Sequence, residues 1–188
     1  MSGLQEYLSE KKQALQARRE KIIANGAEPF TISAHVKAEG RCGVRRIRIR
    51  DFQIISDSDT DFAGYNLGPS SPEIQLGVLG SCLTHIFLIQ ASDRGIPLDS
   101  LEVEVTGQLD PRANHPGYEH VPVYPHNIHY TVRIASPADD AALRELHAAV
   151  ERTCPILNLL AKPQQISGTL VHISDGKEAV SNPPSDGR

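Results

Sequence analysis

The sequence predicts an α+β domain built from antiparallel strand pairs and one long, uncharged helix. Stretches in which apolar and polar residues alternate follow one another directly, so the strands form hairpins rather than repeated strand–helix units. A run without Asp, Glu, Lys or Arg extends from Ile74 to Ser92 and is much longer than a strand. The chain has 188 residues, of which 39% are apolar. That is enough for one domain with a terminal extension, and too apolar for a disordered chain.

The first expected element is a helix over residues 2–24. Ser2 and Gln5 form a capping box, and Asn25-Gly26 is a stop signal. The apolar stripe of this helix is narrow and consists of Leu4, Leu8, Leu15 and Ile22. The helix therefore either packs on the main domain or on a partner, or is a solvated appendage.

Three strands are expected next, over residues 30–39, over residues 44–50 and from residue 52 onward. In each of them apolar residues alternate with polar ones, as in a sheet with one buried face. The alternation slips at Asp51, which indicates a bulge or a tight bend. Residues 57–70 are polar and contain glycine, so they are expected to form a loop.

Ser71-Pro72-Glu73 is typical of a helix start, with a cap, a proline in the first turn and an acid near the positive end of the helix dipole. The uncharged run carries this helix to Asp93. Its length is sufficient to span a bilayer, but it contains six polar residues and two glycines. We therefore predict a helix buried in protein, at a subunit interface, and no membrane association.

Strands are predicted over residues 101–105, 128–134 and 166–172, and a proline-rich loop over residues 110–126. A helix capped by Ser136-Pro137-Ala138-Asp139 is expected to run to Cys154, where Pro155 breaks it. The tail from Ser174 is expected to be disordered. The predicted organisation is a helical extension over residues 1–26, a main domain over 27–173 and a tail over 174–188.

Composition and charge exclude several functions. The net charge of −4 and the pI near 6.0 do not indicate nucleic-acid binding. The start of the chain lacks the basic and apolar regions of a signal peptide, so a cytoplasmic location is expected. The cysteines, Cys42, Cys82 and Cys154, form neither a secreted disulfide framework nor a zinc-binding pattern. No metal and no cofactor are expected.

Five short runs of the sequence carry a family resemblance. They are Gly68-Pro69-Ser70-Ser71-Pro72-Glu73-Ile74-Gln75-Leu76, Leu79-Gly80-Ser81-Cys82, Gly95-Ile96-Pro97-Leu98, Leu101-Glu102-Val103-Glu104-Val105 and Ala149-Val150-Glu151-Arg152-Thr153-Cys154-Pro155-Ile156. With these runs the chain resembles the osmotically inducible protein C (OsmC) and organic hydroperoxide resistance superfamily over roughly residues 30–173. The resemblance implies an intertwined α+β homodimer in which sheets from both chains wrap two long central helices.

The same resemblance implies thiol-dependent reduction of organic hydroperoxides in an oxidative stress response. Cys82 matches the peroxidatic cysteine, whose thiolate is oxidised to a sulfenic acid. Cys154 matches the resolving cysteine, which closes an intramolecular disulfide, and an external dithiol reduces that disulfide again. Glu73 and Arg41 are the best matches for the glutamate and arginine that assist the thiolate.

The sequence departs from the family pattern at both assisting positions. Glu73 precedes Cys82 by nine residues where one branch has ten, and a helix N-terminal acid is the alternative role. No arginine lies between Asp51 and Pro72, where one branch places it, which leaves Arg41 in the first hairpin turn. The other arginines of this hairpin are expected to form an exposed strand face; they are Arg45, Arg46, Arg48 and Arg50.

Further side chains are candidates for substrate binding. His85, one turn after Cys82, either stabilises a thiolate or is a neutral histidine in an interface. Tyr118 and Tyr124 lie in the proline-rich loop, which we expect to shape the pocket mouth. Four histidines in or beside that loop match no standard metal site; they are His115, His120, His126 and His129. Cys42 is interpreted as structural.

The leading hypothesis is a thiol peroxidase with Cys82 and Cys154 as its redox pair. The alternative is a dimer of the same fold that binds a small molecule or handles sulfur without efficient peroxidase activity. A purely structural partner protein is the third possibility, and it predicts that neither cysteine reacts faster than a free thiol.

Overall fold

The structure is a computed structural model, and it describes residues 3–41, 43–174 and 177–181. The chain divides into two compact units, over residues 1–158 and 159–188, which are described separately. Ser2, on which the predicted capping box depends, and Cys42 lie outside the described residues.

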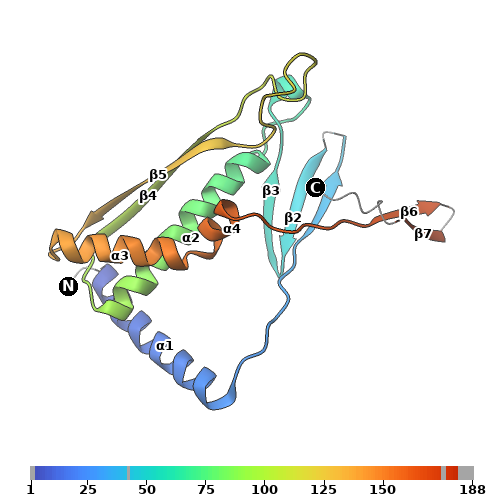
Figure 1. Ribbon diagram of the computed structural model, residues 1–188. Coiled ribbons are helices and arrows are strands. Elements are labelled where there is room, and N and C mark those ends of the chain that lie inside the picture. Colours follow the sequence, from blue (N-terminus) through green and yellow to red (C-terminus); the bar gives the residue numbers. More distant parts are fainter. Residues whose placement is uncertain (1–2, 42, 175–176, 182–188) are drawn as a thin grey trace. The chain divides into compact units, whose positions relative to one another are not determined.

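The first unit contains the predicted helices and antiparallel strands in the predicted order, and it adds a 3₁₀ turn and the helix α4, which were not predicted (Figure 1). Its elements are α1 (Gly3–Asn25), β1 (His35–Glu39), β2 (Val44–Ile49), β3 (Phe52–Ser56), a 3₁₀ turn (Thr60–Phe62), α2 (Ser71–Arg94), β4 (Ser100–Gln108), β5 (His126–Ala135), α3 (Asp140–Thr153) and the start of α4 (Pro155–Ala161). Strands β1, β2 and β3 form one antiparallel sheet, and β4 pairs antiparallel with β5. The predicted α+β class is confirmed.

The slip in alternation at Asp51 is a tight hairpin turn between β2 and β3. Arg50 adopts a left-handed backbone conformation there, with φ of 54°, and Ile49 pairs with Phe52 across the turn. The register aligns Val36, Ile47 and Ile54, so these side chains share one face of the sheet. Val36 and Ile54 remain exposed within this chain.

The predicted strand over residues 30–39 is correct only from His35 onward. Residues 30–34 alternate as a strand would, yet they belong to no strand in the structure. Phe30 and Ile32 are 80% and 84% exposed. A strand needs a hydrogen-bonded neighbour, and β1 pairs only over residues 35–39 with β2.

Helix α2 is the central helix of the first unit. Ser70, one residue before the predicted cap, forms a capping box with Glu73, and Gly95 closes the other end in a left-handed conformation. The helix packs against α1, β4 and α3. It is long and apolar enough to cross a membrane by length and composition, and the core helices of soluble proteins share that property.

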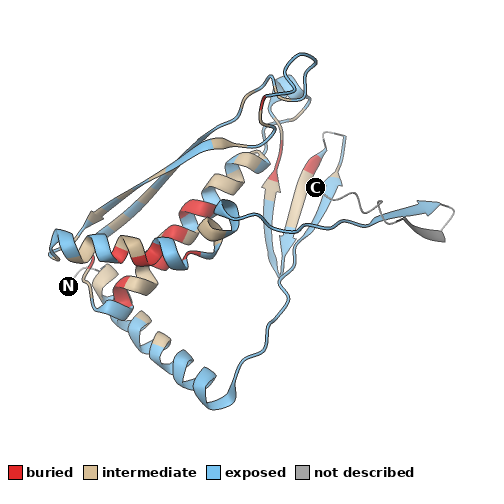
Figure 2. Cartoon of the chain, in the orientation of Figure 1, coloured by how far each residue is buried: buried red, intermediate tan, exposed pale blue. Residues whose placement is uncertain are grey.

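The core lies where α2, α3 and the β4–β5 pair meet (Figure 2). Its most deeply buried apolar side chains are Leu79, Leu83, Phe87, Leu98, Leu146 and Val150. Helix α1 adds Leu8 to this core and is held to the main body by Arg19–Asp93 and Gln5–Asp99 contacts. The helix therefore packs on the main domain, as expected, and is not a solvated appendage.

The second unit contains an antiparallel pair, β6 (Leu170–Ser174) and β7 (Lys177–Ser181). Strand β6 starts later than the predicted strand over residues 166–172. Strand β7 lies in the tail that was expected to be disordered, and that expectation is wrong for residues 177–181. Residues 175–176 and 182–188 lie outside the described part.

Candidate functional site

Two cysteines from distant parts of the sequence meet in the first unit. The sulfur of Cys154 lies 3.6 Å from the sulfur of Cys82 and donates a hydrogen bond to it. Both are free thiols. Cys82 is partly exposed, whereas Cys154 is 0% exposed. A disulfide bond of about 2.0 Å requires only a small movement of either side chain.

The two cysteines are held by different elements. Cys82 lies in the middle of α2, where the helix backbone fixes its position. Cys154 is the residue that follows α3, and its N–H donates to Val150. The side-chain amide of Asn158 donates to the carbonyls of Glu151 and Cys154 and so fixes the turn between α3 and α4. Cys82 therefore lies on a rigid helix, and Cys154 lies in a hydrogen-bonded turn between two helices.

The surroundings of Cys82 act on its acidity in opposite directions. Burial raises the pKa of the Cys82 thiol, and the neighbouring Cys154 raises it further. A hydrogen bond from the backbone N–H of Ile156, in the first turn of α4, lowers it. The net pKa lies above its ordinary value. No cation is among the groups that shift it in the described part of this chain, so the thiol lacks an activating charge from its own protomer.

Glu73 lies in the first turn of α2 and not beside the two cysteines. One carboxylate oxygen, Oε2, accepts hydrogen bonds from the N–H and the hydroxyl of Ser70, each at 2.7 Å. These bonds lower the pKa of the Glu73 carboxyl. Glu73 also lines a shallow hollow with Gly77 and Ser81, and Cys82 is not among the residues that line it. The structure thus supports the alternative role of a helix N-terminal acid.

We expect Glu73 to contribute to stability through this capping box. Its lowered pKa means that the contribution is present above the ordinary carboxyl pKa and disappears as the pH falls through the lowered value. The Glu73→Gln variant should therefore be less stable than the wild type at neutral pH, and this difference should shrink in acid. Urea unfolding at several pH values measures it. Ser70→Ala should lower the free energy of unfolding by about 1 kcal/mol. If the stability difference between Glu73→Gln and the wild type does not change with pH, the assignment of Glu73 to the capping box is wrong.

Arg41 lies in the turn between β1 and β2 and is exposed. Among the described residues it makes no ion pair and no side-chain hydrogen bond. The expectation that the remaining arginines form an exposed face is wrong for Arg45. Its half-buried guanidinium donates to the carbonyl of Asp57 at 2.7 Å and to Ser56 at 3.0 Å, because the loop after β3 folds over it. In the part of the chain that the structure describes, Arg41 thus stays without such a partner.

His85 follows Cys82 by one helical turn and is exposed in this chain. Partial desolvation of the ring and the nearby Lys11 lower the pKa of the imidazole, so the neutral form is favoured. This agrees with the alternative of a neutral histidine. No hydrogen bond links His85 to Cys82 among the described residues.

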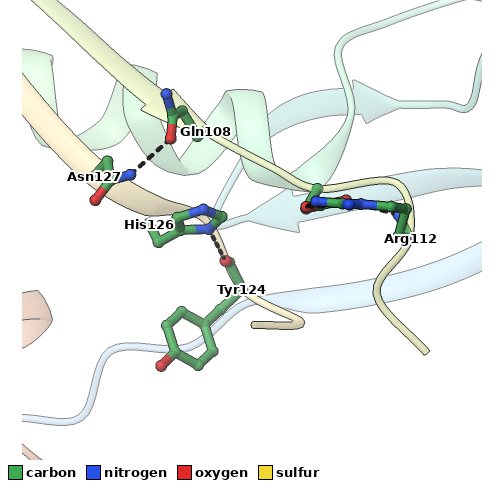
Figure 3. Close-up of polar contacts among 6 residues, drawn as sticks. Gln108, Arg112, Tyr124, His126 and Asn127 are labelled. Atoms are coloured by element: carbon green, nitrogen blue, oxygen red, sulfur yellow. Dashed lines mark hydrogen bonds and ion pairs between the residues drawn. The ribbon is translucent and has the colours of Figure 1, made fainter. Parts of the chain in front are cut away.

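Tyr118 and Tyr124 lie in the proline-rich loop between β4 and β5. This loop lies beside the start of α2, since Leu109 and Pro125 border the same hollow as Ser70. Arg112 stacks on the ring of Tyr118 at 5.4 Å. Figure 3 shows that His126 contacts the backbone carbonyl of Tyr124, while the tyrosine ring points away. The structure does not bring either ring to the cysteine pair.

No group of three or more histidine, cysteine or acidic residues able to hold a metal ion occurs among the described residues. The four histidines of the loop region do not converge on one point within that part of the chain.

One polar network beside the cysteines is missing from the sequence-based prediction. Tyr130 of β5 contacts His147 and Glu151 of α3. The spacing of His147, Glu151 and Cys154, at four and then three residues, is that of one helix face and is a signal available in the sequence. The contribution of Tyr130 follows only from the packing of β5 near α3.

The fold and the paired thiols define an α+β protein with a dithiol centre between the middle of α2 and the end of α3. The model of the OsmC-like protein family matches residues 64–167, which include both cysteines. The chain belongs to the OsmC-like proteins. No curated protein matches the sequence.

Solved structures share this fold at low sequence identity. An OsmC-like protein from Mycoplasma pneumoniae has a TM-score of 0.61 and 18% identity, over 71% of this chain and 89% of that one. An organic hydroperoxide resistance protein OsmC from Legionella pneumophila has a TM-score of 0.51 and 14% identity, over 71% and 91%. An OsmC-like protein of unknown function from Vibrio cholerae has a TM-score of 0.52 and 13% identity, over 70% and 94%. These likenesses establish the fold.

Proposed function

We propose that this protein is a thiol-dependent peroxidase that reduces organic hydroperoxides with Cys82 and Cys154. The observation that supports the proposal most strongly is the 3.6 Å separation of the two sulfurs. The exposure of the two cysteines suits their proposed roles. The partly exposed Cys82 is accessible to a substrate, and the buried Cys154 is protected from direct oxidation.

The proposed catalytic cycle has three steps. The Cys82 thiolate attacks one peroxide oxygen and breaks the O–O bond, which leaves a sulfenic acid on Cys82, and the departing alkoxide takes up a proton from solvent and leaves as an alcohol. Cys154 then displaces the sulfenic oxygen as water and forms the disulfide. An external dithiol supplies two electrons and two protons to restore both thiols. This requirement for a dithiol suits a reducing compartment such as the cytosol.

The apolar surroundings of Cys82 favour an organic hydroperoxide over hydrogen peroxide as the substrate. Cys82 packs against the apolar core, together with Ile156 and Leu157. A hydroperoxide with an apolar substituent gains contacts there that hydrogen peroxide cannot make. A protein of the same fold from Legionella pneumophila is an organic hydroperoxide resistance protein. We expect dithiothreitol-dependent consumption of cumene hydroperoxide to be faster than that of hydrogen peroxide. If neither peroxide is consumed, the proposal is wrong.

We further propose that the active form is a homodimer. Phe30 and Ile32 are exposed on an extended segment with strand-like alternation. The outward face of α2 carries the small residues Gly77 and Ser81, which permit close approach of another helix. A second copy that covers these apolar surfaces would bury them and complete the sheet.

Arg41 of the partner is the proposed source of the missing positive charge. The Arg41→Ala variant should raise the pKa of Cys82 and slow its oxidation by about tenfold or more, because a cation near a thiol favours the thiolate. The measurement is the pH dependence of Cys82 alkylation, together with the rate of oxidation by cumene hydroperoxide. Arg48→Ala, in the same hairpin, is the matched control and should behave as the wild type.

A mixing experiment separates a partner's arginine from one in the same chain. On their own, chains with Cys82→Ser are expected to be inactive, and chains with Arg41→Ala are expected to react slowly. A mixed dimer then contains one complete site if the arginine crosses the interface. Recovery of oxidation in the mixture is the expected result. Equal Cys82 pKa values in Arg41→Ala and the wild type would exclude Arg41 as the activating group.

The alternative is a ligand-binding dimer of the same fold without efficient peroxidase activity. The raised pKa of Cys82 and the engagement of Glu73 in the helix cap favour it, because both leave the thiol without activation in one chain. A tightly bound organic molecule in the purified protein, with no peroxide consumption, would support this alternative.

A further inference from the structure

Helices α3 and α4 meet in a turn at the buried cysteine. Cys154 closes α3, since its N–H donates to the carbonyl of Val150 at 2.8 Å, and Pro155 begins α4. In a continuous helix the N–H of residue 155 would donate to the carbonyl of Glu151, four residues earlier. A proline has no N–H. The Cys-Pro pair therefore leaves the Glu151 carbonyl without its helical donor.

Asn158 supplies a donor in place of the missing one. Its side-chain nitrogen Nδ2 donates to the Glu151 carbonyl at 3.0 Å and to the Cys154 carbonyl at 2.8 Å. A side-chain amide has two N–H donors, so both bonds form at once. The backbone N–H of Asn158 donates to the same Cys154 carbonyl at 3.1 Å. One residue of α4 thus joins the last turn of α3 to the backbone of the cysteine.

The same turn is tied to the helix that carries Cys82. The side-chain amide of Gln90, on α2, donates to the hydroxyl of Thr153 at 3.2 Å, and that hydroxyl donates to the carbonyl of Ala149 at 2.7 Å. Thr153 directly precedes Cys154 in the sequence. Side-chain hydrogen bonds therefore hold the backbone on both sides of this cysteine, through Thr153 before it and through Asn158 after it.

The position of the Cys154 backbone decides how far its sulfur lies from that of Cys82. The side chain of Cys154 is 0% exposed and belongs to the core cluster, and the two sulfurs are 3.6 Å apart. A disulfide of about 2.0 Å forms from this arrangement with a small closing movement. Reacting groups held this close react much faster than free ones, and a displacement of about 1 Å can slow a reaction about a hundredfold.

We propose that Asn158 is the positioning residue of the resolving cysteine, because it replaces the N–H that Pro155 lacks and so keeps the Cys154 sulfur within reach of Cys82. The proposal rests on the proposed peroxidase function. In the step concerned, the Cys154 sulfur attacks the sulfur of the Cys82 sulfenic acid, and the S–S bond forms as the S–O bond breaks. The departing hydroxide takes up the Cys154 proton and leaves as water. Asn158 acts on this step through the backbone of Cys154 and not through its sulfur.

Single-turnover experiments with cumene hydroperoxide test this role, because they separate the two chemical steps. Asn158→Ala should leave the rate of sulfenic acid formation on Cys82 unchanged and slow the subsequent disulfide formation by about tenfold or more. Asn158→Asp keeps the size of the side chain but loses both N–H donors, so it should slow the same step at least as much. The accumulating sulfenic acid is trapped with a 1,3-dicarbonyl reagent and located by mass spectrometry.

A control and a rescue accompany these variants. Gln5→Ala removes a side-chain amide that donates to Asp99 at 2.7 Å, outside the turn, and both steps should keep their wild-type rates. Pro155→Ala restores an N–H at position 155 that can donate to the Glu151 carbonyl. Asn158→Ala should therefore slow disulfide formation by a smaller factor when it is combined with Pro155→Ala than when it is introduced alone.

The outcomes distinguish the positioning role from the underlying function. If Asn158→Ala and Asn158→Asp form the disulfide at the wild-type rate, or slow both chemical steps equally, the positioning role is wrong and the peroxidase function remains. If Asn158→Ala slows disulfide formation by the same factor with and without Pro155→Ala, the amide does not replace the proline N–H and the proposal is also wrong. If the wild type forms neither sulfenic acid nor disulfide, the proposed function itself fails.

Discussion

Replacement of Cys82 by serine should abolish peroxide reduction. A serine hydroxyl cannot be oxidised by a hydroperoxide, so no residual turnover is expected from this position. The sulfur of Cys82 is the partly exposed member of the pair, and Cys154 is fully buried behind it. The measurement is the consumption of cumene hydroperoxide in the presence of a dithiol. Retained turnover in Cys82→Ser would exclude Cys82 as the site of attack.

Cys154→Ser separates attack from resolution and completes this prediction. The variant should consume one equivalent of peroxide and stop at a sulfenic acid on Cys82, because no second thiol lies within bonding distance in the described chain. Cys42→Ser is the matched control for the loss of a thiol and should turn over as the wild type does. Continued disulfide formation in Cys154→Ser would show that another cysteine resolves the intermediate.

Phe87→Ala should cause the largest loss of stability of the single substitutions considered. Phe87 is 0% exposed, lies in the core cluster and stacks on His147. Removal of a buried phenyl ring costs about 3–5 kcal/mol, as lost burial and as a cavity in the core. The free energy of unfolding is measured by urea titration of the reduced protein at fixed concentration. The fixed concentration keeps any contribution from subunit association comparable between variants.

Phe62→Ala is the matched control, since Phe62 is 82% exposed and carries the same side chain. Its unfolding free energy should change by less than about 0.5 kcal/mol. A loss below about 1 kcal/mol for Phe87→Ala would contradict the assignment of the core between α2 and α3.

The elements predicted from the sequence are those that depend on short-range patterns. Hairpin strands follow from alternation within a few residues, and the start of α2 follows from a serine, a proline and an acid in succession. Residues 30–34 show where such patterns fail. They alternate as a strand does, but a strand also needs a neighbour, which this chain does not supply. Alternation in the local sequence does not reveal whether such a neighbour is present.

The candidate site was harder to predict from the sequence than the helices and strands were. Cys82 and Cys154 are 72 residues apart in the sequence, and their pairing was expected from a family resemblance and not from spacing. Two roles were open for Glu73, assistance to the Cys82 thiolate and capping of the helix, because a carboxylate in the first helical turn is equally suited to capping. The contact with Ser70 supports the capping role. Tyr130 was not predicted as a site residue because it contacts His147 only through the packing of β5 near α3.

The most direct test of the proposed redox pair is a reaction of the reduced protein with one equivalent of cumene hydroperoxide, followed by intact-mass measurement and disulfide mapping. We expect a rapid loss of two hydrogen atoms and a single new bond between Cys82 and Cys154, since their sulfurs already lie 3.6 Å apart. Free thiols on both cysteines after the peroxide has been added would contradict it, and the fold would then have to serve a function other than peroxide reduction.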